Sequence, residues 1–81
     1  MAKAMQSRWS RKLSRAIADR RGRTLRTYGE ARDYVLALPE GRQARPQWQH
    51  AAELLMKSED PAAVTEQLER ALFLDMQLKL T

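Results

Sequence analysis

The C-terminal segment, residues 60–80, constrains the fold more than any other part of the sequence. It opens with Asp60 and Pro61, a strong helix start, because an Asp side chain can cap free backbone amides and Pro is tolerated at the first helical position. Apolar residues then recur at three- and four-residue spacing on one face: Val64, Leu68, Ala71, Leu72 and Met76. The pattern predicts an amphipathic helix over residues 61–76, and its apolar face needs a partner.

Two further helices are expected in the middle of the chain. Thr27 and Glu30 have the spacing of a capping box, which predicts a helix over residues 28–38 with an apolar face formed by Tyr28, Ala31, Tyr34, Val35 and Leu38. The polar stretch at residues 39–45 contains Pro39 and Gly41 and is expected to be a loop.

Pro46 opens the next predicted helix, over residues 46–57, whose apolar face holds Trp48, Ala51, Ala52 and Leu55. Residues 58–60 form only a short turn before the C-terminal helix. The last two helices should therefore make an antiparallel hairpin.

The N-terminal segment is expected to be a basic amphipathic helix over residues 3–21, with its ordered part over about residues 8–21. Its apolar side would contain Met5, Trp9, Leu13, Ala16 and Ile17, and a basic strip of Arg8, Arg11, Lys12 and Arg15 would lie beside it. Gly22 can take the left-handed conformation that ends a helix. The start of this segment is expected to fray.

These segments predict an all-α fold: a small three- to four-helix bundle with a C-terminal helical hairpin. With 81 residues the chain is expected to form one domain with one modest core. There is no Cys, so neither a disulfide nor a thiolate metal site is available. The predicted core consists of Leu13, Ile17, Val35, Leu38, Trp48, Leu55, Val64, Leu68 and Leu72.

Charge is distributed unevenly along the chain. Residues 1–27 contain nine basic side chains and one acidic side chain, a net charge of +8, whereas residues 28–81 contain six basic and nine acidic side chains, a net charge of −3. We call residues 28–81 the acidic body. A basic segment of this kind either meets an anionic partner or docks on its own acidic body.

The leading functional hypothesis is a non-enzymatic binding module that contacts nucleic acid, or another anionic partner such as an acidic protein. Phosphate contacts would be independent of sequence and sensitive to salt. The candidate residues are Arg8, Arg11, Lys12, Arg15, Arg20, Arg21, Arg23 and Arg26. The alternative is a solvated basic face on a helix that completes the core.

A second hypothesis is a protein-interaction or self-associating domain. The end of the C-terminal helix is apolar on all sides, so it is either buried by its own domain or covered by another copy or another protein. The candidate residues are Phe73, Leu74, Leu78 and Leu80, and the surplus of aromatic residues also includes Tyr28, Tyr34 and Trp48. Met76, Leu78 and Leu80 alternate with polar residues, so a short extended tail is an alternative to a helical or disordered ending.

Catalysis is not expected. The single His, His50, lies on the polar face of its helix without a second His or a Cys, which is typical of a surface residue rather than a metal ligand or a base. The sequence contains no Gly-rich phosphate loop and indicates no cofactor, metal or small-molecule substrate.

No apolar run reaches the roughly 18 residues of a membrane span, so membrane insertion is not expected and the predicted location is cytoplasmic. The Arg-rich, acid-poor residues 1–27 also resemble a mitochondrial presequence, or a helix that binds a membrane surface. Both readings rank below a core role for this segment.

Overall fold

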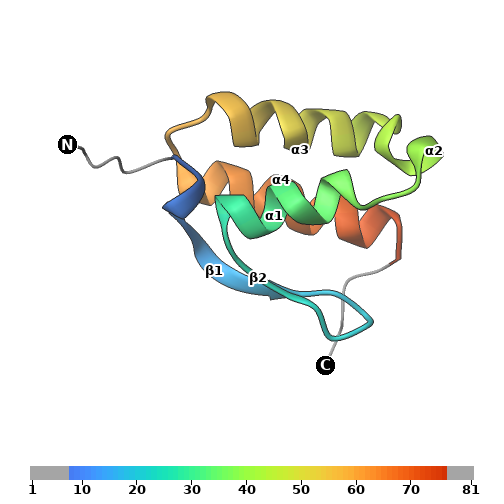
Figure 1. Cartoon of the computed structure of the whole chain (residues 1–81), viewed down its shortest axis with the longest axis horizontal. Coiled ribbons are helices and arrows are strands. Elements are labelled where there is room, and N and C mark those ends of the chain that lie inside the picture. The colour runs from blue at the N-terminus through green and yellow to red at the C-terminus, as the bar shows by residue number, and fades with distance from the viewer. Residues whose placement is uncertain (1–7, 77–81) are drawn as a thin grey trace.

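The computed structural model describes residues 8–76, which form a small α+β fold with a two-stranded antiparallel sheet (Figure 1). In chain order the elements are the 3₁₀ turn η1 (Arg8–Ser10), strands β1 (Lys12–Ala18) and β2 (Thr24–Thr27), and helices α1 (Tyr28–Leu36), α2 (Glu40–Gln43), α3 (Pro46–Lys57) and α4 (Pro61–Leu74). Helices α1 and α4 lie between α3 and the β-hairpin (Figure 1). The all-α prediction is therefore wrong.

The error lies in the N-terminal segment, which is a strand followed by a turn instead of a helix. Leu13 and Ile17 are both buried, as predicted, but a four-residue spacing returns a side chain to the same side in a strand as well as in a helix. The tertiary context decides: the backbone N–H of Ser14 donates to Thr65 Oγ1 of α4 at 2.9 Å. Ala16, predicted to be on the apolar side, is exposed.

The hairpin closes through a turn organised by Asp19. Asp19 Oδ1 accepts the backbone N–H groups of Arg21 and Arg23 at 3.0 and 2.8 Å, and the Asp19 N–H donates to the carbonyl of Arg23 at 2.9 Å. Gly22 has φ +89°, the left-handed conformation that the sequence predicts for it. This conformation turns a hairpin here and does not end a helix.

The pairing of the two strands is irregular. Lys12 is opposite Thr27, whereas Ile17 is opposite Leu25 and Ala18 is opposite Thr24, so the register shifts in between. A shift of this kind interrupts the ladder of backbone hydrogen bonds, as a bulge does, and lets the strand bend and twist. The short hairpin can therefore curve along α1 and α4.

The predicted starts of α1, α3 and α4 are confirmed. Thr27 Oγ1 accepts the N–H of Glu30 at 3.1 Å, Asp60 Oδ1 accepts the N–H of Ala62 at 3.1 Å, and Pro46 and Pro61 occupy first-turn positions. The predicted end of α3, at Lys57, is also confirmed, whereas the ends of α1 and α4 differ from prediction.

Helix α1 ends at Leu36 and α4 at Leu74, and Glu40–Gln43 forms the one-turn helix α2 where a loop was expected. Backbone bonds from Gln43 and Ala44 to the carbonyls of Pro39 and Glu40, at 3.0 and 3.1 Å, close this turn.

The core lies between the hairpin and the helices, and every predicted member of it is buried: Leu13, Ile17, Val35, Leu38, Trp48, Leu55, Val64, Leu68 and Leu72. Leu25 of β2, which was not predicted, is also buried. Met76 departs from the predicted face, because α4 has ended before it and its side chain is 69% exposed.

Candidate anion-binding surface

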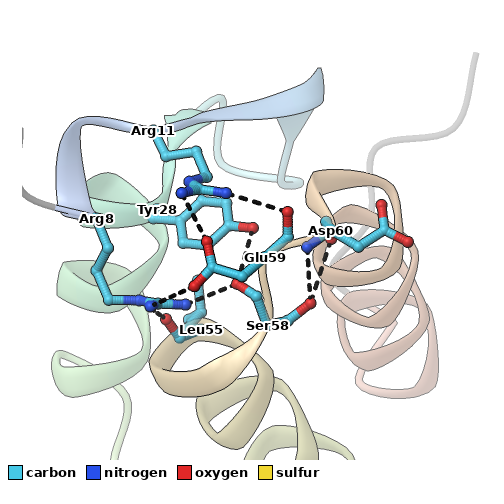
Figure 2. Close-up of polar contacts among 7 residues, drawn as sticks. All are labelled: Arg8, Arg11, Tyr28, Leu55, Ser58, Glu59 and Asp60. Carbon is cyan, nitrogen blue, oxygen red and sulfur yellow. Dashed lines mark hydrogen bonds and ion pairs between the residues drawn. The ribbon is translucent and has the colours of Figure 1, made fainter.

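The predicted basic residues divide into two groups. One group binds other parts of the chain and the other is exposed on the hairpin, and Arg8 belongs to the first. Its Nε donates to the carbonyl of Leu55 at 2.8 Å, and its Nη2 donates to the carbonyl of Ser58 at 2.7 Å (Figure 2). The Leu55 carbonyl is in the last turn of α3, where carbonyls have no helical partner and a positive charge is favoured by the helix dipole. Arg8 therefore caps α3.

Arg11 reinforces the same contact. Its Nη1 donates to the carbonyl of Glu59 at 3.0 Å, and its Nη2 lies 2.7 Å from Glu59 Oε1 (Figure 2). The guanidinium carbons of Arg8 and Arg11 also lie 5.7 and 5.9 Å from the ring centroid of buried Tyr28, within cation–π range. We call Arg8, Arg11 and Arg15 the docking arginines.

Arg15 projects from β1 and pairs with Glu69 of α4. Its Nε donates to Glu69 Oε2 at 2.9 Å, and its Nη2 contacts Glu69 Oε1. This two-point hydrogen bond raises the pKa of Arg15 above its usual value. All three docking arginines thus join the N-terminal segment to the acidic body. For these three residues the structure shows docking on the chain's own acidic body, the second of the two alternatives that the charge distribution left open.

The remaining five candidates are exposed on the hairpin. None of their side chains forms an ion pair with any residue between 8 and 76, although the Arg23 guanidinium lies 5.7 Å from the Tyr34 ring. They come from both strands and the turn, and we call them the hairpin cations: Lys12, Arg20, Arg21, Arg23 and Arg26.

A cavity of about 360 Å³ lies beside the hairpin turn. Its polar lining consists of Asp19, Arg21, Arg23, Tyr34 and Arg42, and its apolar wall consists of Ala37, Leu38 and Pro39. Sequence reasoning did not anticipate this site, because Arg42 belongs to the acidic body and is brought to the turn only by the fold. We call it the turn cavity.

Inside the turn cavity, the Tyr34 hydroxyl donates to Asp19 Oδ2 at 2.8 Å. Burial, and secondly this hydrogen bond, raise the pKa of Tyr34 to about 12. Asp19 thus accepts three hydrogen bonds, two from the turn backbone and one from Tyr34. Its carboxylate orders the cavity wall.

Arg42 approaches the cavity from α2. Its Nε donates to Asp75 Oδ2 at 3.0 Å, while its buried Nη2 lies 3.0 Å from the same oxygen without forming a hydrogen bond. Asp75 also pairs with Arg45, at 2.8 Å. One carboxylate therefore faces two guanidinium groups.

The predicted interaction residues have a mixed outcome. Phe73 and Leu74 are 59% and 55% exposed at the end of α4, whereas Tyr28, Tyr34 and Trp48 are buried in the core. Leu78 and Leu80 lie outside the described residues. His50 is exposed on α3, and residues 8–76 contain no cluster of three His, Asp or Glu side chains able to hold a metal ion.

Comparisons with protein-family models, with curated proteins and with solved structures found no match to this chain. None of the helices between residues 8 and 76 is long and apolar enough to cross a membrane.

Proposed function

We propose that this protein is a non-enzymatic binding module that contacts nucleic acid through its β-hairpin. The observation that carries the proposal is the exposure of the hairpin cations, which have no ion pairs among the described residues. The docking arginines, although the sequence predicts that they contact nucleic acid, are not part of the proposed surface. Their guanidinium groups are already bound to carbonyls and carboxylates. The cytoplasmic location predicted from the sequence remains part of the proposal.

The shape of the hairpin fits this role. A two-stranded ribbon is narrow enough to enter the major groove of DNA, and Lys and Arg side chains on it can reach phosphates on either side. Such contacts do not read the base sequence. If all five hairpin cations met phosphates of a duplex, log K would fall with log salt with a slope of about −4 to −5.

A salt series with random-sequence DNA and RNA tests the proposal. The double variant Arg20→Gln/Arg26→Gln removes two hairpin cations, and Lys57→Gln/Arg70→Gln removes the same charge from exposed positions on α3 and α4. The hairpin variant should bind more weakly and flatten the salt slope for duplex DNA by about 2, while the control retains the wild-type slope.

Two results would reject nucleic-acid binding through the hairpin. One is a wild-type protein without affinity for DNA or RNA at about 20 mM salt, where phosphate contacts are strongest. The other is an equal loss of affinity in both double variants, because this would indicate a general charge effect.

The exposed end of α4 favours a second candidate, a protein-interaction surface that includes self-association. Phe73 and Leu74 are adjacent large apolar residues that are both more than half exposed, and contiguous patches of this kind often mark interfaces. Sedimentation of the wild type and of Phe73→Ser across a concentration series tests self-association. A wild type that stays monomeric at all concentrations would reject it.

A further inference from the structure

We infer that the turn cavity binds a terminal phosphate monoester of a nucleic-acid strand. The inference rests on the proposed function and refines it: the hairpin cations contact phosphodiesters along the strand, while the cavity holds its end. The cavity is next to the hairpin, and Arg21 and Arg23 belong both to the hairpin cations and to the cavity lining.

The charges around the cavity suit a dianion. Arg21, Arg23 and Arg42 line it against the single carboxylate of Asp19. Asp75 lies behind Arg42 but is shared with Arg45, so it does not cancel the excess. These four arginines and two carboxylates leave a net charge of +2. A phosphate monoester carries about −1.5 to −2 at pH 7, whereas an internal phosphodiester carries a single negative charge.

The hydrogen-bonding groups suit the same ligand. Asp19 already accepts hydrogen bonds from the two turn N–H groups and the Tyr34 hydroxyl, so its oxygens do not occupy the Arg21 and Arg23 donors. Arg42 Nη2 is held 3.0 Å from Asp75 Oδ2, whereas Arg21 and Arg23 have exposed side chains that form no ion pair with any residue between 8 and 76. Guanidinium groups bind phosphate oxygens in a two-point geometry. Donors are therefore in excess over acceptors here.

The size and the wall of the cavity leave space beyond the phosphoryl group. Its volume of about 360 Å³ lies near the lower end of the range for small-molecule sites, about 300–1,000 Å³. Ala37, Leu38 and Pro39 form an apolar side against which a sugar or base can pack. The cavity can thus accept a terminal nucleotide.

Binding of one oligonucleotide, prepared with a 5′-phosphate and with a 5′-hydroxyl, measures the contribution of the terminal phosphate. We expect the phosphorylated strand to bind wild-type protein about tenfold more tightly, in keeping with one good bidentate charge-assisted contact. The variant Arg21→Gln/Arg23→Gln should lose this difference. The matched control Arg20→Gln/Arg26→Gln, which leaves the cavity lining intact, should bind both strands more weakly and keep the tenfold ratio.

Equal affinity of the wild type for the two strands would overturn the inference while leaving the proposed function standing. If neither strand binds, the proposed function fails, and a titration with a nucleoside 5′-monophosphate, followed by NMR, decides the cavity separately. Shifts of the Arg21, Arg23 and Arg42 signals that inorganic phosphate reproduces only in part would support the inference, and unchanged signals would overturn it. Thermal melts of both double variants verify that they fold.

Discussion

The indole Nε1 of Trp48 donates a hydrogen bond of 2.6 Å to Asp75 Oδ2, and so joins the first turn of α3 to the residue that ends α4. The Asp75 side chain is only 1% exposed and also accepts from Arg42, Arg45 and Gln47. Burial acts to raise the pKa of Asp75, but the hydrogen bonds from Trp48, Arg45 and Arg42 outweigh it and hold the pKa below its usual value.

Replacing Asp75 with Asn should destabilise the protein by about 1–3 kcal/mol, because it weakens several hydrogen bonds and leaves Trp48 and two guanidinium groups with a neutral, partly mismatched partner. Urea denaturation at pH 7 measures this loss. Asp33→Asn is the control, since Asp33 is exposed and its one ion pair among residues 8–76 is with the neighbouring Arg32. Equal stability of Asp75→Asn and wild type would mean that the Asp75 contacts contribute nothing.

The stability that Asp75 provides should also depend on pH. Its pKa is lower in the folded protein than in the unfolded chain, so its contribution is complete above the unfolded value near 4 and is lost as pH falls through the folded value. The gap in urea midpoint between wild type and Asp75→Asn should therefore narrow as the pH is lowered from 5 to about 2. A gap that stays constant over this range would contradict the lowered pKa.

Arg8 should be more important for stability than an equally charged hairpin residue. Arg8→Gln removes the donors that satisfy the carbonyls of Leu55 and Ser58, at a cost of about 1–3 kcal/mol, whereas Arg20→Gln changes an exposed side chain and should stay within about 0.5 kcal/mol of wild type. Thermal melts of both variants make the comparison. Equal melting temperatures would show that Arg8 does not hold the end of α3.

Leu68→Ala should be among the most destabilising changes. Leu68 is fully buried on α4, the helix that contacts both α3 and β1, and a cavity of this kind costs about 2–5 kcal/mol. Leu74→Ala, on the same helix but 55% exposed, provides the control. Denaturant curves measure the loss of unfolding free energy in both variants. Equal losses would mean that the face of α4 containing Leu68 does not pack into the core.

The helices were predictable because their signals are local. The Asp60–Pro61 start, the Thr27–Glu30 cap and the apolar stripe of α4 are each set by residues close together in the sequence, and the fold keeps all of them except Met76 at the end of the stripe. The burial of Leu13 and Ile17 was also predictable, since that spacing places them together in either kind of element.

The strand was not predictable from periodicity alone, because its deciding contacts come from distant residues. The Ser14 N–H donates a hydrogen bond to Thr65, and the Arg15 side chain donates to Glu69. Both acceptors lie more than 50 residues further along the chain. One local signal was available: Asp19 three residues before Gly22 is typical of a turn. The turn cavity could not be predicted, because Arg42 reaches it only through the packing of α2.

The contribution of Tyr34 to the stability of the fold should decrease at high pH. Burial and the hydrogen bond to Asp19 raise its pKa to about 12 in the folded protein, against an ordinary value near 10. Its contribution is therefore complete below pH 10 and is lost as pH rises towards 12. Tyr34→Phe should be less stable at pH 8, and the difference from wild type should shrink between pH 10 and 12. A difference that is unaffected by pH would argue against the raised pKa.

The close approach of η1 to α1 leads to the last prediction. A Cβ placed on Gly29 would lie 2.9 Å from the backbone oxygen of Trp9 and 3.3 Å from its Cβ. Ala within a helix is ordinarily more favourable than Gly by up to about 1 kcal/mol, but here the backbone of η1 would have to move.

We expect Gly29→Ala to lower the melting temperature and to change the fluorescence of Trp9, whose ring lies 4.6 Å from the Arg32 guanidinium. Gly41→Ala is the matched control, because a Cβ there meets no atom within 4 Å and φ is not positive; this variant should be as stable as wild type or slightly more stable. A Gly29→Ala protein that melts at or above the wild-type temperature would mean that η1 does not pack on α1 in solution, and the capping of α3 by Arg8, which begins η1, would then lack its support.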